Sequence, residues 1–212
     1  MKQDDHRRLF QALAVALCVL LAISLVPILQ LSRYSRPAYD DYGYGLYTHR
    51  ALESGGSLFG AVWYTVKQNY LTWQGSFAAM ALMALTPLIF SEQLYWITTG
   101  VMLASLIFGT VKLSHTLVCR LLKGEWWQCA LVCVPMLLLS IQFVPSPWEA
   151  FYWWNGAVYY TFTYGISLLY IERLAALFCP ERPAVWKILL PGVLWGSWWG
   201  AATMSRRCCA PC

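Results

Sequence analysis

The chain has 212 residues, of which 59% are hydrophobic and only 12% are charged. A soluble domain normally carries about twice that share of charged residues, so the composition excludes an ordinary soluble protein and predicts an integral membrane protein. The net charge of +5 comes from Lys and Arg residues scattered between apolar segments. Because they form no basic face interleaved with aromatic residues, nucleic acid is not an expected partner, whereas membrane lipids are.

Six apolar segments follow one another along the chain, at residues 9–31, 71–90, 94–113, 129–144, 158–178 and 188–200. The first has no charged residue and, as a helix, is long enough to cross a hydrocarbon core of about 30 Å. Its apolar run is longer than that of a signal peptide and no small-x-small cleavage site precedes the tyrosines, so we interpret it as a retained anchor. The expected fold is all-α: a polytopic helical membrane protein with five to six membrane segments, forming a single domain over residues 1–200.

The positions of the basic residues favour one topology. Lys2, Arg7 and Arg8 predict a cytoplasmic N-terminus in the cell membrane. Segment 71–90 carries polar residues at one end and Pro87 at the other, so its apolar part is short for a full span. If it does not cross, the later basic clusters also lie inside, as the positive-inside rule prefers.

This topology has a consequence for the polar segments. It places the loop after the first span and residues 144–164 on the same outer face, whereas a crossing at 71–90 would place them on opposite faces. Within that loop, residues 58–70 have apolar side chains mostly at helical spacing and predict an interfacial helix, with Gly55 and Gly56 as a break before it.

The loop after the first span opens with two adjacent carboxylates, Asp40 and Asp41, among tyrosines. Adjacent residues point to different sides, so the two carboxylates are not expected to share one proton. One can face a site while the other holds a metal, a hydrogen bond or the local backbone. The alternative is a solvated loop in which Asp40 initiates a turn toward Gly43 and the tyrosines anchor at the interface.

Residues 144–164 form a second polar and aromatic stretch, with one acid and one amide inside a dense run of Trp, Tyr and Phe. Aromatic faces with a few polar groups are suited to binding sugar rings, although an aromatic belt at the membrane interface explains part of the crowding. Glu149 could equally be a surface acid at a helix start after Ser146 and Pro147. The candidate binding residues of this stretch are Glu149, Trp153, Trp154, Asn155 and Tyr159.

The remaining patterns give weaker information about function. Trp73 with Gln74 fits a helix start with a tryptophan anchor. Cysteines and histidines show no metal-ligand spacing, and the CxxC at the C-terminus lacks a βαβ context. Residues 201–212 interrupt an apolar segment with two arginines and three cysteines. Dropping two bases from the back-translated codons allows a continued apolar helix, so we interpret 201–212 as an out-of-frame tail on the N-terminal part of a longer parent.

The combination of "YDDY", "YLTWQGSF" and "WEAFYWWNGAVYYT" resembles the polytopic GT-C class of glycosyltransferases and, more narrowly, an uncharacterised family of bacterial multi-pass membrane proteins related to that class. The resemblance implies transfer of a sugar from a polyprenyl-phosphate donor at the outer membrane face. Asp40 or Asp41 would act as general base or help to bind a divalent metal ion. Arg50 or Lys67 could neutralise the donor phosphate, and Arg is better suited to bidentate contact. Members of the class have more spans, so this chain is expected to lack part of the site and can be inactive.

Two other functions stay open at this point. A transporter or flippase for a lipid or polymer predicts ionisable residues inside the spans, where the sequence offers almost none except Lys112 and Glu172 near their ends. A non-catalytic membrane scaffold predicts that Glu149 and Asn155 tolerate alanine. The sequence assigns no sugar, acceptor or oligomeric state.

Overall fold

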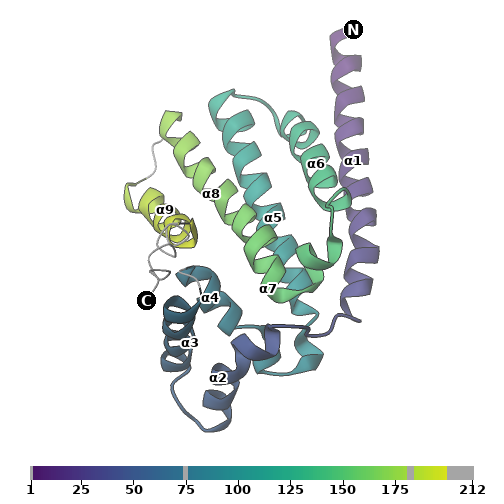
Figure 1. The fold of residues 1–212 in the computed structure, drawn as a ribbon. Coiled ribbons are helices and arrows are strands. Elements are labelled where there is room, and N and C mark those ends of the chain that lie inside the picture. The colour runs from purple at the N-terminus through teal and green to yellow at the C-terminus, as the bar shows by residue number, and fades with distance from the viewer. Residues whose placement is uncertain (1, 74–75, 181–183, 200–212) are drawn as a thin grey trace.

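The computed structural model describes residues 2–73, 76–180 and 184–199, and over these residues the chain is all-α without a β-strand. Four helices lie side by side and form the body of the molecule (Figure 1): α1 (Lys2–Ser32), α5 (Ile97–His115), α6 (Trp126–Gln142) and α8 (Thr163–Ala175). α9 (Trp186–Trp199) packs on α8. Residues 201–212 lie outside the described residues.

Three shorter helices gather at one end of this body, which we call the α2–α4 end (Figure 1). They are α2 (Asp41–Glu53), α3 (Leu58–Thr72) and α4 (Phe77–Ala84). The opposite end, where α1 begins, is the N-terminal end. A four-residue helix, α7 (Trp154–Ala157), and six short turns of 3₁₀ or π-helix connect these elements within the described residues. The turns are η1 (Pro87–Ile89), η2 (Glu92–Leu94), η3 (Thr116–Leu121), η4 (Trp148–Tyr152), η5 (Val158–Phe162) and η6 (Ala176–Phe178).

Within the part of the chain that the structure describes, two helices are long and apolar enough to cross a membrane, Asp4–Ser32 and Glu92–Leu121. Leu9 and Ile23 of the first are 64% and 63% exposed, as expected of a helix that faces lipid. Length and composition therefore support membrane association. The full number of crossings and the orientation of the N-terminus stay predictions.

Segment 71–90 does not form one long helix. α4 has eight residues and covers about 12 Å, far less than a hydrocarbon core. The chain then breaks at Thr86, whose side chain accepts a hydrogen bond from the Leu88 amide, and Pro87 starts a separate 3₁₀ turn. The structure therefore breaks this apolar segment into short pieces, and the expectation that it does not cross the membrane stays a prediction.

α5 and α8 approach closely because each offers a glycine at the contact. A Cβ on Gly109 would lie 2.6 Å from the carbonyl oxygen of Gly165, and a Cβ on Gly165 would lie 2.8 Å from the carbonyl group of Ser105. Such small residues allow helix backbones to pack tightly where a hydrophobic driving force is weak. This contact holds α5 and α8 together in the body of the molecule, next to the α2–α4 end.

The loop after the first span is more helical than the sequence suggested. The helix expected at residues 58–70 is confirmed as α3, whose N-cap Ser57 accepts a hydrogen bond from the Gly60 amide. The alternative of a solvated turn from Asp40 to Gly43 is wrong, because α2 begins at Asp41 and passes through Gly43. Gly55, with φ of +66°, provides the expected break between the two helices.

Candidate functional site

The two adjacent aspartates lie in opposite environments at the start of α2. Asp40 is the N-cap residue and is exposed, whereas Asp41 is the first helical residue and is fully buried. Tyr39, just before them, has φ of +49°, a region that residues other than glycine seldom adopt. The expectation that the two carboxylates face different sides is confirmed, and only Asp40 is accessible to a ligand.

Asp41 is part of a buried cluster that joins three elements. Its Oδ2 accepts hydrogen bonds from the Tyr95 hydroxyl and, at 3.0 Å, from the Ala38 amide. The Tyr95 hydroxyl in turn accepts from the Trp154 amide at 2.9 Å. Burial raises the pKa of Asp41 above its ordinary value, and hydrogen bonds, chiefly that from Tyr95, partly offset the rise. Asp41 therefore attaches the start of α2 to the body of the molecule.

Asn155 lies beside this cluster. Its backbone amide is close enough to the Asp41 carboxylate to lower the pKa of Asp41, although the Oδ1 atom of Asp41 has no partner at hydrogen-bonding geometry. The Asn155 side chain is buried, and neither of its polar atoms has a partner within the described residues. Buried polar atoms are normally paired, so these three unpaired atoms mark a distinct polar position between α2 and α7.

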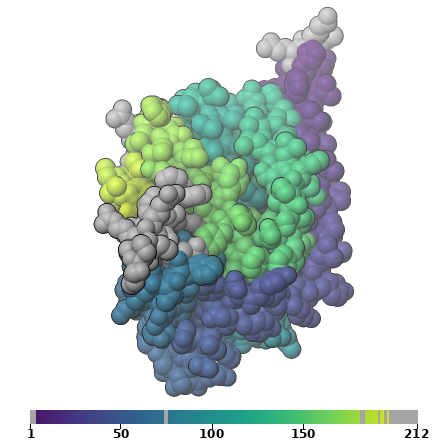
Figure 2. Space-filling view, viewed as in Figure 1, coloured from purple at the N-terminus to yellow at the C-terminus, as the bar shows by residue number. Residues whose placement is uncertain are grey.

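The loop after the first span and residues 144–164 therefore meet at one end of the molecule. Figure 2 shows the green surface of the later stretch lying directly against the blue surface of the α2–α4 end. The two stretches thus lie at the same end of the molecule, and the side of the membrane that this end faces stays a prediction.

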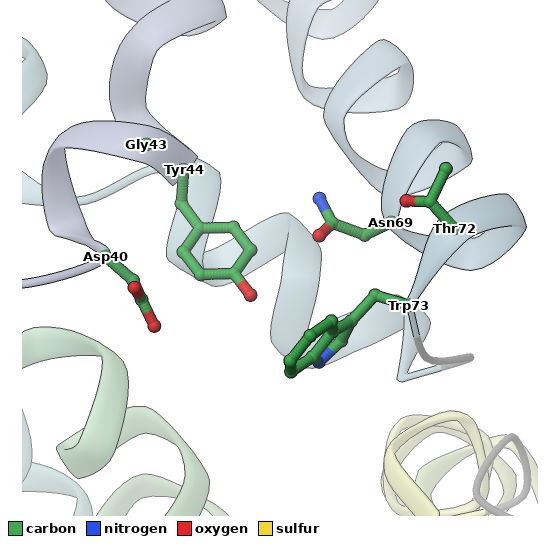
Figure 3. Close-up of a pocket in the computed structure, with 6 residues that line it drawn as sticks. All are labelled: Asp40, Gly43, Tyr44, Asn69, Thr72 and Trp73. Carbon is green, nitrogen blue, oxygen red and sulfur yellow. The ribbon is translucent and has the colours of Figure 1, made fainter.

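A pocket of about 360 Å³ opens between α2 and α3. It is lined by Asp40, Gly43, Tyr44, Asn69, Thr72 and Trp73. Figure 3 shows the side chains of Tyr44, Asn69 and Trp73 turned toward one space, with the Asp40 carboxylate at its α2 side. Burial raises the pKa of Tyr44, and the nearby Asp40 and Tyr159 add to the rise. One carboxylate, one amide, two hydroxyls and one indole thus share a pocket of the size that small ligands use.

An aromatic cluster lies next to Asp40. The rings of Trp148 and Trp153 stack with centroids 5.0 Å apart, and Tyr39 packs edge-on against both at 5.7 Å. Gly156 is required beneath them, because a Cβ there would lie 2.6 Å from the Trp153 ring. Tyr39 is 78% exposed, so the cluster offers an aromatic surface beside the exposed carboxylate.

The other residues predicted in the 144–164 stretch have different positions. Trp154 is buried, and its Nε1 donates to the Leu82 carbonyl at 2.9 Å, so it supports the site from within. Tyr159 is half-buried and lies close to Tyr44, which lines the pocket. Glu149 is half-buried in the first turn of η4, as the helix-start alternative predicted.

The two predicted phosphate-binding residues do not line the pocket. Arg50 and Lys67 are exposed on α2 and α3, the helices that flank it. Tyr95 has no local sequence signal of its role, because its partners come from distant segments. Trp73, predicted to be a membrane anchor, lines the pocket, and Asn69 faces the pocket only once α3 has formed.

Among residues 2–73, 76–180 and 184–199, no group of three or more His, Cys, Asp or Glu side chains is placed to hold a metal ion. The Oδ2 atom of Asp41 bonds to Tyr95 and Ala38, whereas its buried Oδ1 has no partner within the described residues, so the suggested metal-binding role of this residue stays a prediction. Comparisons with protein-family models, curated proteins and solved structures found no match to this chain.

Proposed function

We propose that this chain is a membrane glycosyltransferase-like protein that uses a sugar carried on a polyprenyl phosphate, with Asp40 as the general base. One observation carries the proposal: the exposed carboxylate of Asp40 lines a pocket whose other walls include an indole, a phenol and an amide. A sugar ring offers an apolar face to aromatic side chains and hydroxyl groups to polar ones, so this lining suits it.

In the proposed reaction the Asp40 carboxylate accepts the proton of the acceptor hydroxyl. The hydroxyl oxygen forms a bond to the anomeric carbon of the sugar as the bond from that carbon to the donor phosphate breaks, and the phosphate leaves with the electron pair. Asp41 is a positioning residue, because it fixes the first turn of α2 and so the place of its neighbour.

The donor phosphate would lie outside the sugar pocket. Arg50 and Lys67 are the candidates to neutralise it, because each is exposed on one of the helices that flank the pocket. Arg50 is the better suited of the two to bidentate contact with phosphate oxygens. No contact within the structure fixes either side chain in that role, so the assignment rests on charge and placement.

The proposal places the α2–α4 end at the outer face of the cell membrane, with the N-terminus in the cytoplasm and several helices crossing. Support comes from the basic residues Arg7, Arg120 and Lys123, which belong to segments at the N-terminal end. Positive residues are favoured on the cytoplasmic side. The exposed aromatic cluster at the opposite end fits the outer interface.

The transporter alternative is less well supported. It needs an ionisable residue available inside the helix bundle, and the buried acid of α8, Glu172, already has partners. Its carboxylate accepts a hydrogen bond from Thr116 at 2.6 Å and lies 2.6 Å from the Arg173 guanidinium. This acid is therefore used to hold α8 against the end of α5.

The experiment uses the purified full chain in proteoliposomes with a panel of radiolabelled polyprenyl-phosphate monosaccharides. Release of free polyprenyl phosphate reports turnover whatever the acceptor. We expect Asp40→Asn to lower the rate by about 100-fold or more, the usual contribution of a general base. Asp5→Asn, a matched change of an exposed carboxylate at the N-terminal end, should leave it unchanged. Turnover that is equal in Asp40→Asn contradicts Asp40 as the base, and absent turnover together with no binding of the sugar to the pocket contradicts the proposal.

A further inference from the structure

A second pocket lies on another face of α2, between this helix and the short turns η1 and η2. It has a volume of about 320 Å³. Residues 88–92 line one wall, and four residues of α2 line the other: Tyr42, Gly45, Leu46 and His49. Their spacing of three and four positions places them on one side of the helix. None of them lines the pocket between α2 and α3, so the two pockets are separate sites.

Two hydrogen bonds connect the opposite walls of this pocket. The His49 ring donates from Nδ1 to the Ile89 carbonyl at 2.9 Å, a contact that assigns the hydrogen to this nitrogen. The Tyr42 hydroxyl donates to Glu92 Oε1 at 2.9 Å. Both bonds join residues at least 40 positions apart in the sequence. The pocket is therefore formed before a ligand arrives, as small-molecule sites usually are.

The charge of the lining is negative. Glu92 lines the pocket, whereas no Lys or Arg does so among the described residues. Glu92 forms no ion pair within the described part of the chain, and its side-chain partner is the neutral Tyr42 hydroxyl. The His49 ring turns its Nε2 toward Glu53, at 3.4 Å from Oε1. The pocket thus offers a carboxylate whose charge is not balanced by a cationic side chain.

Three oxygen acceptors border this space. The first is the Glu92 carboxylate. The second is the Tyr42 hydroxyl oxygen, which gives its hydrogen to Glu92 and keeps its lone pairs for another donor. The third is Ser91 Oγ, which accepts from the Gln93 amide at 3.1 Å and has a second lone pair. A primary ammonium group has three N–H donors, so this set of acceptors matches it, whereas a quaternary ammonium group has no N–H to donate.

The pocket also lies at the depth where lipid headgroups are expected. The candidate span Glu92–Leu121 begins at the acid of the lining. Phe90, which lines the pocket, is 64% exposed, and Trp96, within the first turns of the span, is 49% exposed. Aromatic side chains beside a charged residue at the end of a span are typical of the headgroup region of a membrane.

We propose that this pocket binds a primary ammonium group, that of a phosphatidylethanolamine headgroup or of a free amine, through Glu92, Tyr42 and Ser91. The apolar lining, which includes Leu46 and Phe90, contacts the carbon atoms attached to the nitrogen. This inference does not rest on the proposed function, because the two pockets share no lining residue.

The first arm of the test measures lipid. The full chain is placed in nanodiscs of phosphatidylcholine with phosphatidylethanolamine, and native mass spectrometry measures the ratio of the two lipids retained after release. We expect Glu92→Gln to lower the preference for phosphatidylethanolamine about tenfold, because a charge-assisted contact is lost. Tyr42→Phe should lower it about fivefold, the effect of one neutral hydrogen bond. Asp5→Asn, a matched loss of an exposed carboxylate at the N-terminal end, should leave the ratio unchanged.

A measurement in detergent without lipid separates binding from folding. Glu92 is exposed and is in no ion pair among the described residues, so Glu92→Gln should unfold at the same temperature as the unaltered chain. A lost lipid preference with a maintained unfolding temperature can then be assigned to the lost charge. Tyr42→Phe gives an independent result from the other wall of the pocket.

The second arm adds ethanolamine, or choline as the control without N–H donors, to the protein in pure phosphatidylcholine nanodiscs and measures the unfolding temperature. A rise with ethanolamine alone that Glu92→Gln abolishes, without a preference for phosphatidylethanolamine, identifies a free amine as the ligand and supports the pocket. A lipid preference without an ethanolamine effect identifies the headgroup. If the unaltered chain shows neither effect, if Glu92→Gln and Tyr42→Phe behave as it does in both arms, or if Asp5→Asn loses as much preference, the assignment is overturned.

Discussion

The hydroxyl of Tyr95 donates a hydrogen bond to the carboxylate of Asp41, although 54 positions separate the two residues in the sequence. Both side chains are fully buried, and the same hydroxyl accepts from the Trp154 amide. This single contact connects α2, the start of a candidate span and α7. It also leaves Asp40, one residue earlier, facing the pocket, so the buried aspartate fixes the position of the exposed one.

Removal of the Tyr95 hydroxyl tests this role. Tyr95→Phe leaves the Asp41 carboxylate and the Trp154 amide without their shared partner inside the protein, so we expect a loss of about 2–3 kcal/mol in the free energy of unfolding. Tyr42→Phe is the matched control, because its hydroxyl bonds to Glu92 at 2.9 Å at the surface, and it should cost about 1 kcal/mol or less. Unfolding by SDS in mixed micelles measures both. Equal losses of unfolding free energy in the two variants would show that the buried hydrogen bond of Tyr95 stabilises the fold no more than the exposed one of Tyr42.

The raised pKa of Asp41 predicts how stability depends on pH. Because the folded state holds the proton more tightly than the unfolded state, whose pKa is near the ordinary 3.8, protonation of Asp41 stabilises the fold. That contribution is complete below the unfolded pKa and is lost as the pH rises toward the folded one. Asp41→Asn cannot titrate, so its unfolding temperature relative to the unaltered chain should increase as the pH rises from about 4 to neutrality. A difference that shrinks over this range would mean that the pKa is lowered instead.

Much of the helical fold follows from sequence pattern. The apolar run at 94–113 became α5 and that at 129–144 became α6, which continues through Pro135, because a long apolar stretch has few other ways to satisfy its backbone. Pro87 and the polar residues before α4 correctly indicated a broken segment. The distribution of charge predicted that the loop of Asp41 and the stretch of Asn155 share one face, and the structure places both at the same end of the molecule.

The details of the site depended on tertiary contacts that no local pattern encodes. Nothing in the sequence around Tyr95 indicates that its hydroxyl reaches Asp41, since that contact exists only after α2 folds back on the start of the span. The sequence also cannot tell that Asp41 is buried and Asp40 is exposed, because this difference depends on which residues pack on α2. Asn69 lines the pocket only because α2 and α3 pack beside each other.

The contact of α5 with α8 predicts a sharp difference between two glycines of the same helix. Gly109→Ala places a methyl group 2.6 Å from a backbone oxygen that cannot move aside, so we expect a loss of about 1–3 kcal/mol in the free energy of unfolding. Gly100→Ala has nothing within 4 Å of the new methyl group and should be neutral or stabilise by up to about 1 kcal/mol. Unfolding in mixed micelles compares them. Similar values for both would argue against the close crossing of α5 and α8.

Trp73 tests whether the pocket between α2 and α3 binds a sugar. Its indole lines the pocket and is 72% exposed, so Trp73→Ala removes an aromatic contact to the ligand with little effect on packing. We expect the dissociation constant of a soluble glycosyl phosphate, measured by isothermal titration calorimetry, to rise about tenfold, equivalent to about 1.4 kcal/mol.

Trp63→Ala is the matched control for this measurement. Trp63 lies on α3 and is 58% exposed, but it does not line the pocket, so its loss should leave the dissociation constant unchanged. Because calorimetry measures binding without turnover, Trp73→Ala can support the pocket even if the chain as it stands does not complete the reaction. Equal weakening by both changes would mean that the sugar contacts the outer face of α3, and binding unaffected by either would remove the pocket from the proposed site.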